Sequence, residues 1–527
     1  MGSMGGAGVA DEKPHAVCLP FPAQGHITPM FNVAKLLHAR GFHVTFVNSE
    51  YNHARLVRTR GAAALAGFPG FRFDTIPDGM PAIDDYDDDI TQDIPKLCKS
   101  TTETCLEPFR RLLSEINSSA SAEGHPPVTC VISDVIMGFS MDAAKELGLP
   151  YVQLSTASAV SYLAYHHYNL LIDRGIFPLK GTHACPSIQQ TYSHAALSLL
   201  VYLISQRALH GYVTYVRVDV KLLTDGYLNT PVEDVPGLRS MRLRDFPSFI
   251  HSTDPEEFMV GYAIKETART ASASAVIINS FADLEGQEVD AMETLLGLPK
   301  VYMLGPLPLV AAPQSTAISG LSLWKEQEEC LQWLHDKDPG SVVYVNFGSI
   351  VVMTSEQLVE FAWGLANSGR EFIWIIRRDL VKGDAAVLPP EFLAMTAERG
   401  FMASWCPQQE VLNHPTVGAF LTHSGWNSAL ESICAGVPVL SWPFFADQQT
   451  NCRYQCNEWG VGMEIDSNVQ RDVVSVLIME LMEGEKGKAM RKRAEEWREK
   501  AVMAAEPDGS AHRNFDELVR DVLLAKH

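Results

Sequence analysis

The sequence predicts an α/β protein in which two Rossmann-like domains face each other across a cleft. In both halves of the chain, short apolar runs typical of buried strands alternate with helical patterns, as in parallel sheets covered by helices. The 527 residues are also too many for one ordinary core, so two large domains are expected. In sheets of this kind, ligands bind beyond the carboxyl ends of the strands.

Composition and charge narrow the classes of function. Apolar residues make up 46% of the chain and charged residues 20%, which is typical of a soluble globular protein. The formal net charge of −21 argues against a nucleic-acid partner, because a basic face cannot easily form. The longest apolar run, near residues 195–204, is too short to span a bilayer, and the Gly-rich N-terminus lacks a secretory signal. We expect no membrane insertion.

The cysteine pattern indicates a reducing compartment. The ten cysteines include no C-x-x-C pair, and most lie inside apolar runs, as small buried residues do. Cys452 and Cys456 share a helical face, but no histidine or second pair is placed to complete a zinc site. We therefore expect a cytoplasmic protein without a metal site.

Residues 15–300 are expected to form the first domain, after a flexible N-terminus at 1–14. The domain opens with a strand at 15–20, a turn at 24–26, a helix at 28–39 and a strand at 43–47. This unit lacks G-x-G-x-x-G, so no dinucleotide cofactor is indicated. His26 lies just beyond the carboxyl end of the first strand. A lone histidine is more often structural, but this position makes it a candidate acid–base group.

Asp134 has a similar position, directly after a predicted strand at 128–133. The alternative is that it caps the helix that follows. The acidic run at 84–89 contains an Asp-x-Asp pattern, which we interpret as a solvated loop. Residues 181–220 join a polar stretch to an apolar run, and long segments without structure of their own are uncommon inside compact domains.

The second half is expected to hold a linker at 301–325, a second domain at 326–500 and a final helix at 501–527. The first strand of this domain, at 341–346, ends in a glycine turn that places Ser349 where a phosphate could bind. A later strand at 417–421 leads into a helix that starts near Gly425. The free N–H groups and the dipole of a helix start favour an anion there.

Several polar residues gather around that helix start. His423, Asn427 and Glu431 are spaced so that they share one face of the helix. Another apolar strand, at 437–443, delivers Asp447 and Gln448 just past its carboxyl end. The region from 405 to 448 therefore reads as a ligand site.

The stretch from Trp405 to Gln448 closely resembles the signature box of plant family 1 UDP-glycosyltransferases. Pro-Gln, Thr-His, Gly-Trp-Asn-Ser, Gly-Val-Pro, Trp-Pro and Asp-Gln all stand in register from end to end of the box. Ser424 departs from the pattern, because the family usually has cysteine there. The resemblance covers nearly the whole chain except the extreme N-terminus and residues 181–220. Members of the family have only a few residues there, so we interpret 181–220 as an atypical insertion that comes from a retained intron or a gene-model error, with a lineage-specific acceptor flap as the alternative. It implies the GT-B fold, in which the last helix crosses back onto the first domain.

The resemblance also implies the roles of individual residues. The first domain would bind the acceptor, with His26 as general base and Asp134 as its orienting partner. The second domain would bind UDP-glucose as co-substrate, and the glutamine at position 448 favours glucose. The UDP-binding residues would be Ser349, Trp405, Cys406, Gln408, His423, Gly425, Asn427, Ser428 and Glu431, and the sugar-binding residues Trp426, Asp447 and Gln448.

The reaction implied is an inverting transfer of glucose to a hydroxyl of a small lipophilic acceptor, which gives a β-O-glucoside. No cofactor and no metal are expected, because preorganised donors near residue 425 can stabilise the leaving diphosphate. Residues 41–81 and 241–247 look closest to the subgroup that acts on cyanohydrins, terpenoids and cytokinins, and related enzymes accept flavonoids.

Two other functions stay open at this point. One is a UDP-sugar-binding protein whose transferase activity is impaired or absent because of the insertion. The other is a sugar-nucleotide epimerase on the same fold, which would need no acceptor. In the main interpretation we expect a monomer whose partners are the UDP-sugar and the acceptor.

Overall fold

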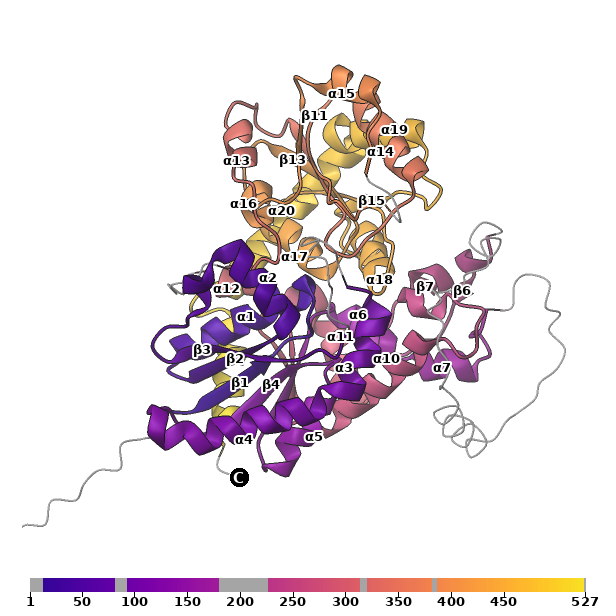
Figure 1. The fold of residues 1–527 in the computed structure, drawn as a ribbon. Helices are drawn as coiled ribbons and strands as arrows, with labels where there is room; N and C mark the ends of the chain where they lie inside the picture. Colours follow the sequence, from indigo (N-terminus) through magenta and orange to yellow (C-terminus); the bar gives the residue numbers. More distant parts are fainter. Residues whose placement is uncertain (1–12, 81–91, 180–225, 313–319, 382–385, 526–527) are drawn as a thin grey trace, which may run out of the picture.

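The computed structural model describes residues 13–80, 92–179, 226–312, 320–381 and 386–525. Most of the expected flexible N-terminus, the acidic run at 84–89 and the insertion at 181–220 lie outside the described residues. Within them, two α/β domains face each other, one drawn in indigo to magenta and the other in orange to yellow (Figure 1). The predicted fold class of two Rossmann-like domains is confirmed.

The first domain is built on a seven-stranded sheet in the order β3-β2-β1-β4-β5-β8-β9, with every pair parallel. The order reverses between β1 and β4, so a crevice opens there at the carboxyl ends of the strands. The strands are β1 (His15–Leu19), β2 (His43–Ser49), β3 (Phe71–Ile76), β4 (Cys130–Asp134), β5 (Tyr151–Ser155), β8 (Ala275–Ile278) and β9 (Val301–Met303).

The alternation of side chains along a strand gives this sheet two apolar faces. In β1, Ala16 and Cys18 pack into the core with α1 and the end of the chain, whereas Val17 and Leu19 pack into the core with α4 and α5. The helices of this domain are α1 (Gln24–Ala39), α2 (Glu50–Arg60), α3 (Ile94–Thr104), α4 (Leu106–Glu123), α5 (Phe139–Glu146), α6 (Ala159–His166), α7 (Tyr168–Asp173), α10 (Phe258–Arg269), α11 (Ala282–Leu295) and α12 (Leu307–Val310).

The second domain repeats this plan with a six-stranded parallel sheet in the order β12-β11-β10-β13-β14-β15. Here the order reverses between β10 and β13, so a second crevice faces the first. The strands are β10 (Val342–Asn346), β11 (Glu371–Ile375), β12 (Gly400–Ala403), β13 (Val417–Thr422), β14 (Val439–Ser441) and β15 (Gly462–Glu464).

Helices cover both faces of the second sheet as well. Val343 and Val345 pack with α14 and α19, and Val342 and Tyr344 pack with α13 and α16. The helices are α13 (Glu329–Leu334), α14 (Ser355–Ser368), α15 (Pro390–Thr396), α16 (Gln408–Leu412), α17 (Trp426–Ala435), α18 (Gln448–Arg453), the π-helix η6 (Tyr454–Glu458), α19 (Arg471–Glu483) and α20 (Glu485–Ala505).

The expected turn at residues 24–26 is wrong, because α1 already begins at Gln24. Ala23 is extended, and its carbonyl accepts hydrogen bonds from the N–H groups of His26 and Ile27, so residues 24–26 form the first helical turn. Pro29 lies inside the helix and has no N–H to donate to the Gly25 carbonyl. That carbonyl is therefore free for another partner.

The expected start of the linker, at residue 301, lies inside the first sheet. Residues 301–303 form β9, which pairs with β8, so the first sheet extends past the expected boundary at residue 300. At the end of the chain, α21 (Ser510–Leu518) and the π-helix η7 (Val519–Leu523) share an apolar core with the first domain. The yellow end of the ribbon lies beside that domain in Figure 1. No helix in the described ranges is both long and apolar enough to cross a bilayer.

Candidate active site

A cavity of about 720 Å³ lies between the two domains, where the two crevices face each other. Every residue predicted to bind UDP or sugar lines this cavity, and so does His26. Asp134 lies behind His26 and is fully buried. The structure therefore brings the predicted residues of both domains to one space.

His26 is held at its Nδ1 atom by two side chains of the first domain. The Asp134 carboxylate lies 2.7 Å from Nδ1, and the Thr156 hydroxyl lies 2.9 Å from it. Asp134 ends β4 and Thr156 directly follows β5, so neighbouring strand ends supply both partners. A carboxylate on Nδ1 fixes the tautomer in which Nε2 carries no proton. Within the described residues, Nε2 receives no hydrogen bond, and it is available to a ligand.

One end of the cavity has a network suited to a nucleoside. The Gln408 amide donates to Ser428 Oγ (2.9 Å) and to the Glu431 carboxylate (2.7 Å), and its oxygen accepts from Asn346 (2.8 Å). Burial raises the pKa of Glu431. Cys406 is buried, with its Sγ 3.2 Å from the Tyr344 hydroxyl. These contacts fix the polar groups at this end before a ligand arrives.

Trp405 lines the same end, and one of its faces is already covered. The Trp324 ring stacks on it with ring centres 4.7 Å apart and planes at 23°. The Arg55 guanidinium lies 4.7 Å from the centre of the Trp324 ring. The first domain, the linker and the second domain therefore each contribute one layer to this stack.

The middle of the cavity is shaped by the imidazole of His423, which lies between Gly348 and Gly425. A Cβ atom at either glycine would lie 2.4 Å from an imidazole atom, so no side chain fits at these two positions. Burial lowers the pKa of His423 to about 3, and the charge of Arg377 adds to this, so the ring is neutral at neutral pH. Arg377 itself is buried and donates to the carbonyls of Gly348 and Val351, which holds the loop that carries Ser349.

The first turn of α17 faces the same region. Gly425 is the residue before the helix, and the first N–H groups of the helix have no partner within it. Across the cleft, the Asn427 amide donates to the Gly25 carbonyl at 2.8 Å, the group that Pro29 leaves free. The Trp426 indole is buried and donates to the Asn279 carbonyl at 2.9 Å. The Trp426 side chain therefore links the two domains.

Asp447 and Gln448 lie at the other end of the cavity, just past β14. Burial raises the pKa of Asp447 to about 6, and a hydrogen bond from Asn451 opposes the shift. Gln448 Oε1 accepts from the N–H groups of Phe444 and Phe445, at 2.9 and 3.0 Å, which shapes the loop before α18. Beyond them, the first domain contributes an apolar part of the wall, with Phe21, Ile136, Tyr165, Phe249 and Met259. Phe445 of the second domain packs against Phe249 there.

Comparison with known proteins decides the family. A family model described as UDP-glucoronosyl and UDP-glucosyl transferase matches residues 257–493. The 7-deoxyloganetin glucosyltransferase of Gardenia jasminoides is 50% identical, over 98% of both chains. The (R)-mandelonitrile beta-glucosyltransferase of Prunus dulcis is 48% identical, again over 98% of both.

This chain is a member of the UDP-glycosyltransferase family. Its relatives agree with the subgroup that the sequence resembles. Among solved structures, a UDP-glucosyltransferase from Polygonum tinctorium capable of glucosylating indoxyl is 26% identical, with a TM-score of 0.71 over 98% of this chain and 99% of that one. A UDP-glucose: anthocyanidin 3-O-glucosyltransferase in complex with UDP is 25% identical, with a TM-score of 0.73 over 97% and 98%. The predicted GT-B fold and glycosyltransferase class are confirmed.

Some residues of this UDP-glycosyltransferase site are missing from the sequence prediction. Thr156 directly follows a strand, so the rule that selected Asp134 could have selected it too. Trp324 and Arg377 carry no comparable signal, because their contacts join segments far apart in the chain. Asn451 lies just beyond the signature box, and no motif marks it.

Proposed function

We propose that this UDP-glycosyltransferase moves glucose from UDP-glucose to a hydroxyl of a small lipophilic acceptor, with inversion, to give a β-O-glucoside. One observation carries the proposal. His26 lies in the wall of the cavity, with Asp134 2.7 Å from its Nδ1 and with Nε2 free. The residues of the second domain that suit a sugar nucleotide line the same cavity.

His26 would act as the general base. Its Nε2 would take the proton of the acceptor hydroxyl while the oxygen attacks the anomeric carbon and the bond from that carbon to the diphosphate breaks. Asp134 would orient the ring and stabilise the imidazolium that forms. A positioned base of this kind contributes a factor of roughly 10²–10⁴ to the rate.

The leaving UDP gains negative charge, which the second domain can stabilise. The first N–H groups of α17 and the hydroxyls of Ser349 and Ser428 would donate to the diphosphate. His423, neutral at neutral pH, would act as a hydrogen-bonding group rather than as a cation. We propose that these preorganised donors serve this role, with no metal ion required.

The uracil, ribose and glucose of the donor would bind to other groups that line the cavity. Uracil would stack on the face of Trp405 that Trp324 leaves open, with Cys406 and Gln408 at its edge. The Glu431 carboxylate would accept hydrogen bonds from the ribose hydroxyls. Asp447 and Gln448 would bind the glucose hydroxyls, together with the backbone N–H of Trp426.

The apolar wall of the first domain favours acceptors with a compact lipophilic body. The curated relatives are named for 7-deoxyloganetin and mandelonitrile. We therefore propose terpenoid and cyanohydrin alcohols as the first acceptors to test, with flavonoids and hormone-like alcohols after them. The buried, unpaired cysteines of the described residues suit a cytoplasmic location, and we propose a monomer.

The test is product formation from UDP-glucose and a panel of terpenoid, cyanohydrin and flavonoid acceptors, followed by mass spectrometry. We expect a product one hexose heavier than its acceptor, and we expect His26→Ala to lower kcat by roughly 10²–10⁴. His335→Ala, at an exposed histidine, is the control and should match the wild type. If UDP-glucose binds but no acceptor is converted, the chain is a UDP-sugar-binding protein instead.

A further inference from the structure

Asn451 is a buried amide at the domain interface for which the proposed mechanism has no role so far. It lies in α18, three residues after Gln448, and its side chain is fully buried. All of its hydrogen-bonding positions are used, since two hydroxyls donate to its oxygen and its N–H groups donate to two acceptors. A buried amide that is satisfied in this way holds its partners in one arrangement.

The oxygen of Asn451 faces the first domain. It accepts from Ser158 Oγ at 2.7 Å and from Ser161 Oγ at 3.1 Å. Ser158 is also the N-cap of α6, where it accepts from the N–H of Ser161. This N-cap lies two residues after Thr156, whose hydroxyl contacts His26. Asn451 therefore bonds to the chain segment that leaves the catalytic wall of the first domain.

The amide nitrogen of Asn451 faces the donor site. It donates to Asp447 Oδ2 at 2.9 Å and to the Ser424 carbonyl at 3.0 Å. Ser424 has a φ of +63° and Ala446, next to Asp447, has a φ of +56°. Residues other than glycine adopt this left-handed conformation at an energetic cost, so bonds from outside the turn are needed to keep it.

We propose that Asn451 is a positioning residue that holds the Asp447 carboxylate and the turn at Ser424 in place for the sugar of the donor and ties both to the acceptor domain. The inference rests on the proposed function, because it takes Asp447 as a sugar-binding group. Asn451 itself does not line the cavity, so its effect passes through Asp447 and Ser424.

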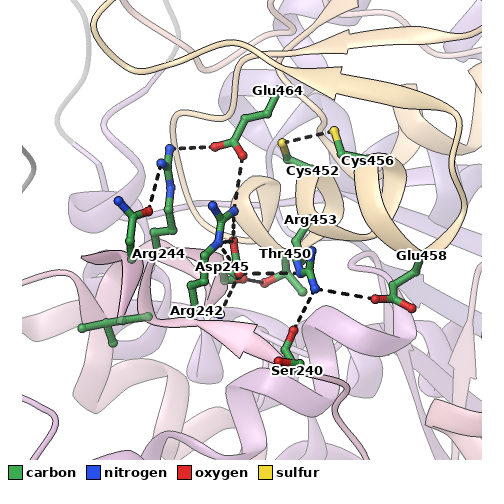
Figure 2. Close-up of polar contacts among 12 residues, drawn as sticks. Ser240, Arg242, Arg244, Asp245, Thr450, Cys452, Arg453, Cys456, Glu458 and Glu464 are labelled. Atoms are coloured by element: carbon green, nitrogen blue, oxygen red, sulfur yellow. Dashed lines mark hydrogen bonds and ion pairs between the residues drawn. The ribbon is translucent and has the colours of Figure 1, made fainter. Parts of the chain in front are cut away.

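A role in holding α18 against the first domain is the competing explanation, but other bonds already do this. On the flank shown in Figure 2, the Thr450 hydroxyl donates to the Asp245 carbonyl at 2.7 Å, and Arg453 donates to the Ser240 carbonyl at 2.9 Å. Arg242 and Arg244 reach from the same segment to Glu464 of the second domain. The helix therefore stays docked when the bonds of Asn451 are changed.

The test is Asn451→Asp, which keeps the size of the side chain and an oxygen for the two serines. It replaces the N–H donors by an oxygen that faces Asp447 and the Ser424 carbonyl. We expect the dissociation constant of UDP-glucose to rise about tenfold and kcat to fall by a similar factor. The dissociation constant of UDP should change less than about twofold. Calorimetry with both nucleotides and initial rates give these values. Asn468→Asp, at an exposed asparagine of the same domain, is the matched control.

Asn451→Ala, which removes all the bonds, is the second variant and should show the same selective loss. Unchanged UDP-glucose binding and kcat in both variants would overturn the inference. Loss of UDP and UDP-glucose affinity by one common factor, or failure of both variants to fold, would also overturn it and leave Asn451 a structural residue. If the wild type makes no product, the proposed function fails, but the ratio of the two dissociation constants still tests Asn451.

Discussion

His423 shows how single residues shape the donor site. Its imidazole fills the space between Gly348 and Gly425, so the ring requires a glycine at both positions. Gly348 also has a φ of +69°, and Gly369, at the end of α14, has a φ of +68° with no atom near its missing Cβ. Comparing substitutions at Gly348 and Gly369 therefore distinguishes the effect of backbone strain from the effect of steric contact with His423.

We predict that Gly348→Ala weakens UDP binding about tenfold, because the new methyl group displaces the His423 imidazole from the diphosphate position. Both Gly348→Ala and Gly369→Ala should lose roughly 1–2 kcal/mol of stability from the left-handed backbone. Only the first should lose UDP affinity. Calorimetry and thermal unfolding of both variants check this, and equal UDP affinities would contradict it.

Single residues also show what can and what cannot be predicted from the sequence. The sequence predicts that Asp134 and Asp447 lie near the cavity because each follows a strand, and polar residues at strand ends gather at one edge of a parallel sheet. It does not predict the partners of these residues. Ser158 and Asn451 are 293 positions apart, and only the packing of the two domains brings them together.

At the scale of elements, the stack around Trp405 joins three segments. Arg55 comes from α2, Trp324 from the linker region and Trp405 from the loop before α16. The linker region therefore does more than connect the domains, since Trp324 supports the Trp405 ring on which uracil would stack. The strands and helices around it were predictable from hydrophobic pattern, but this contact was not.

We predict that Trp324→Ala weakens UDP binding by roughly 2- to 10-fold, since an aromatic pair contributes about 0.5–1.5 kcal/mol beyond its buried area. Trp324→Phe should recover part of the affinity. Trp333→Ala, at a tryptophan on α13 packed near Phe401, is the control. If Trp324→Ala binds UDP as tightly as this control does, the stack has no role in donor binding.

At the scale of the whole molecule, the proposed mechanism divides the reaction between the two domains. His26, the proposed general base, lies at the switch point of the first sheet, between β1 and β4, and the residues proposed to bind the donor lie at the switch point of the second, between β10 and β13. The overall plan followed from the sequence, because alternating strands and helices in two halves leave few other architectures. The exact start of α1 could not be predicted from the sequence, because Pro29 is typical of a first helical turn but lies inside the helix.

This division also predicts the stereochemistry. A hydroxyl activated by His26 would approach the anomeric carbon from the first domain, while the second domain would hold the departing UDP on the other side. The single displacement that results would invert the α-linked donor.

The most direct test is the anomeric configuration of the glucoside formed from UDP-glucose, read by proton NMR. We predict a β-glucoside from the wild type and its loss in His26→Ala. An α-glucoside, or a β-glucoside formed equally fast without His26, would contradict direct attack by an acceptor that His26 deprotonates.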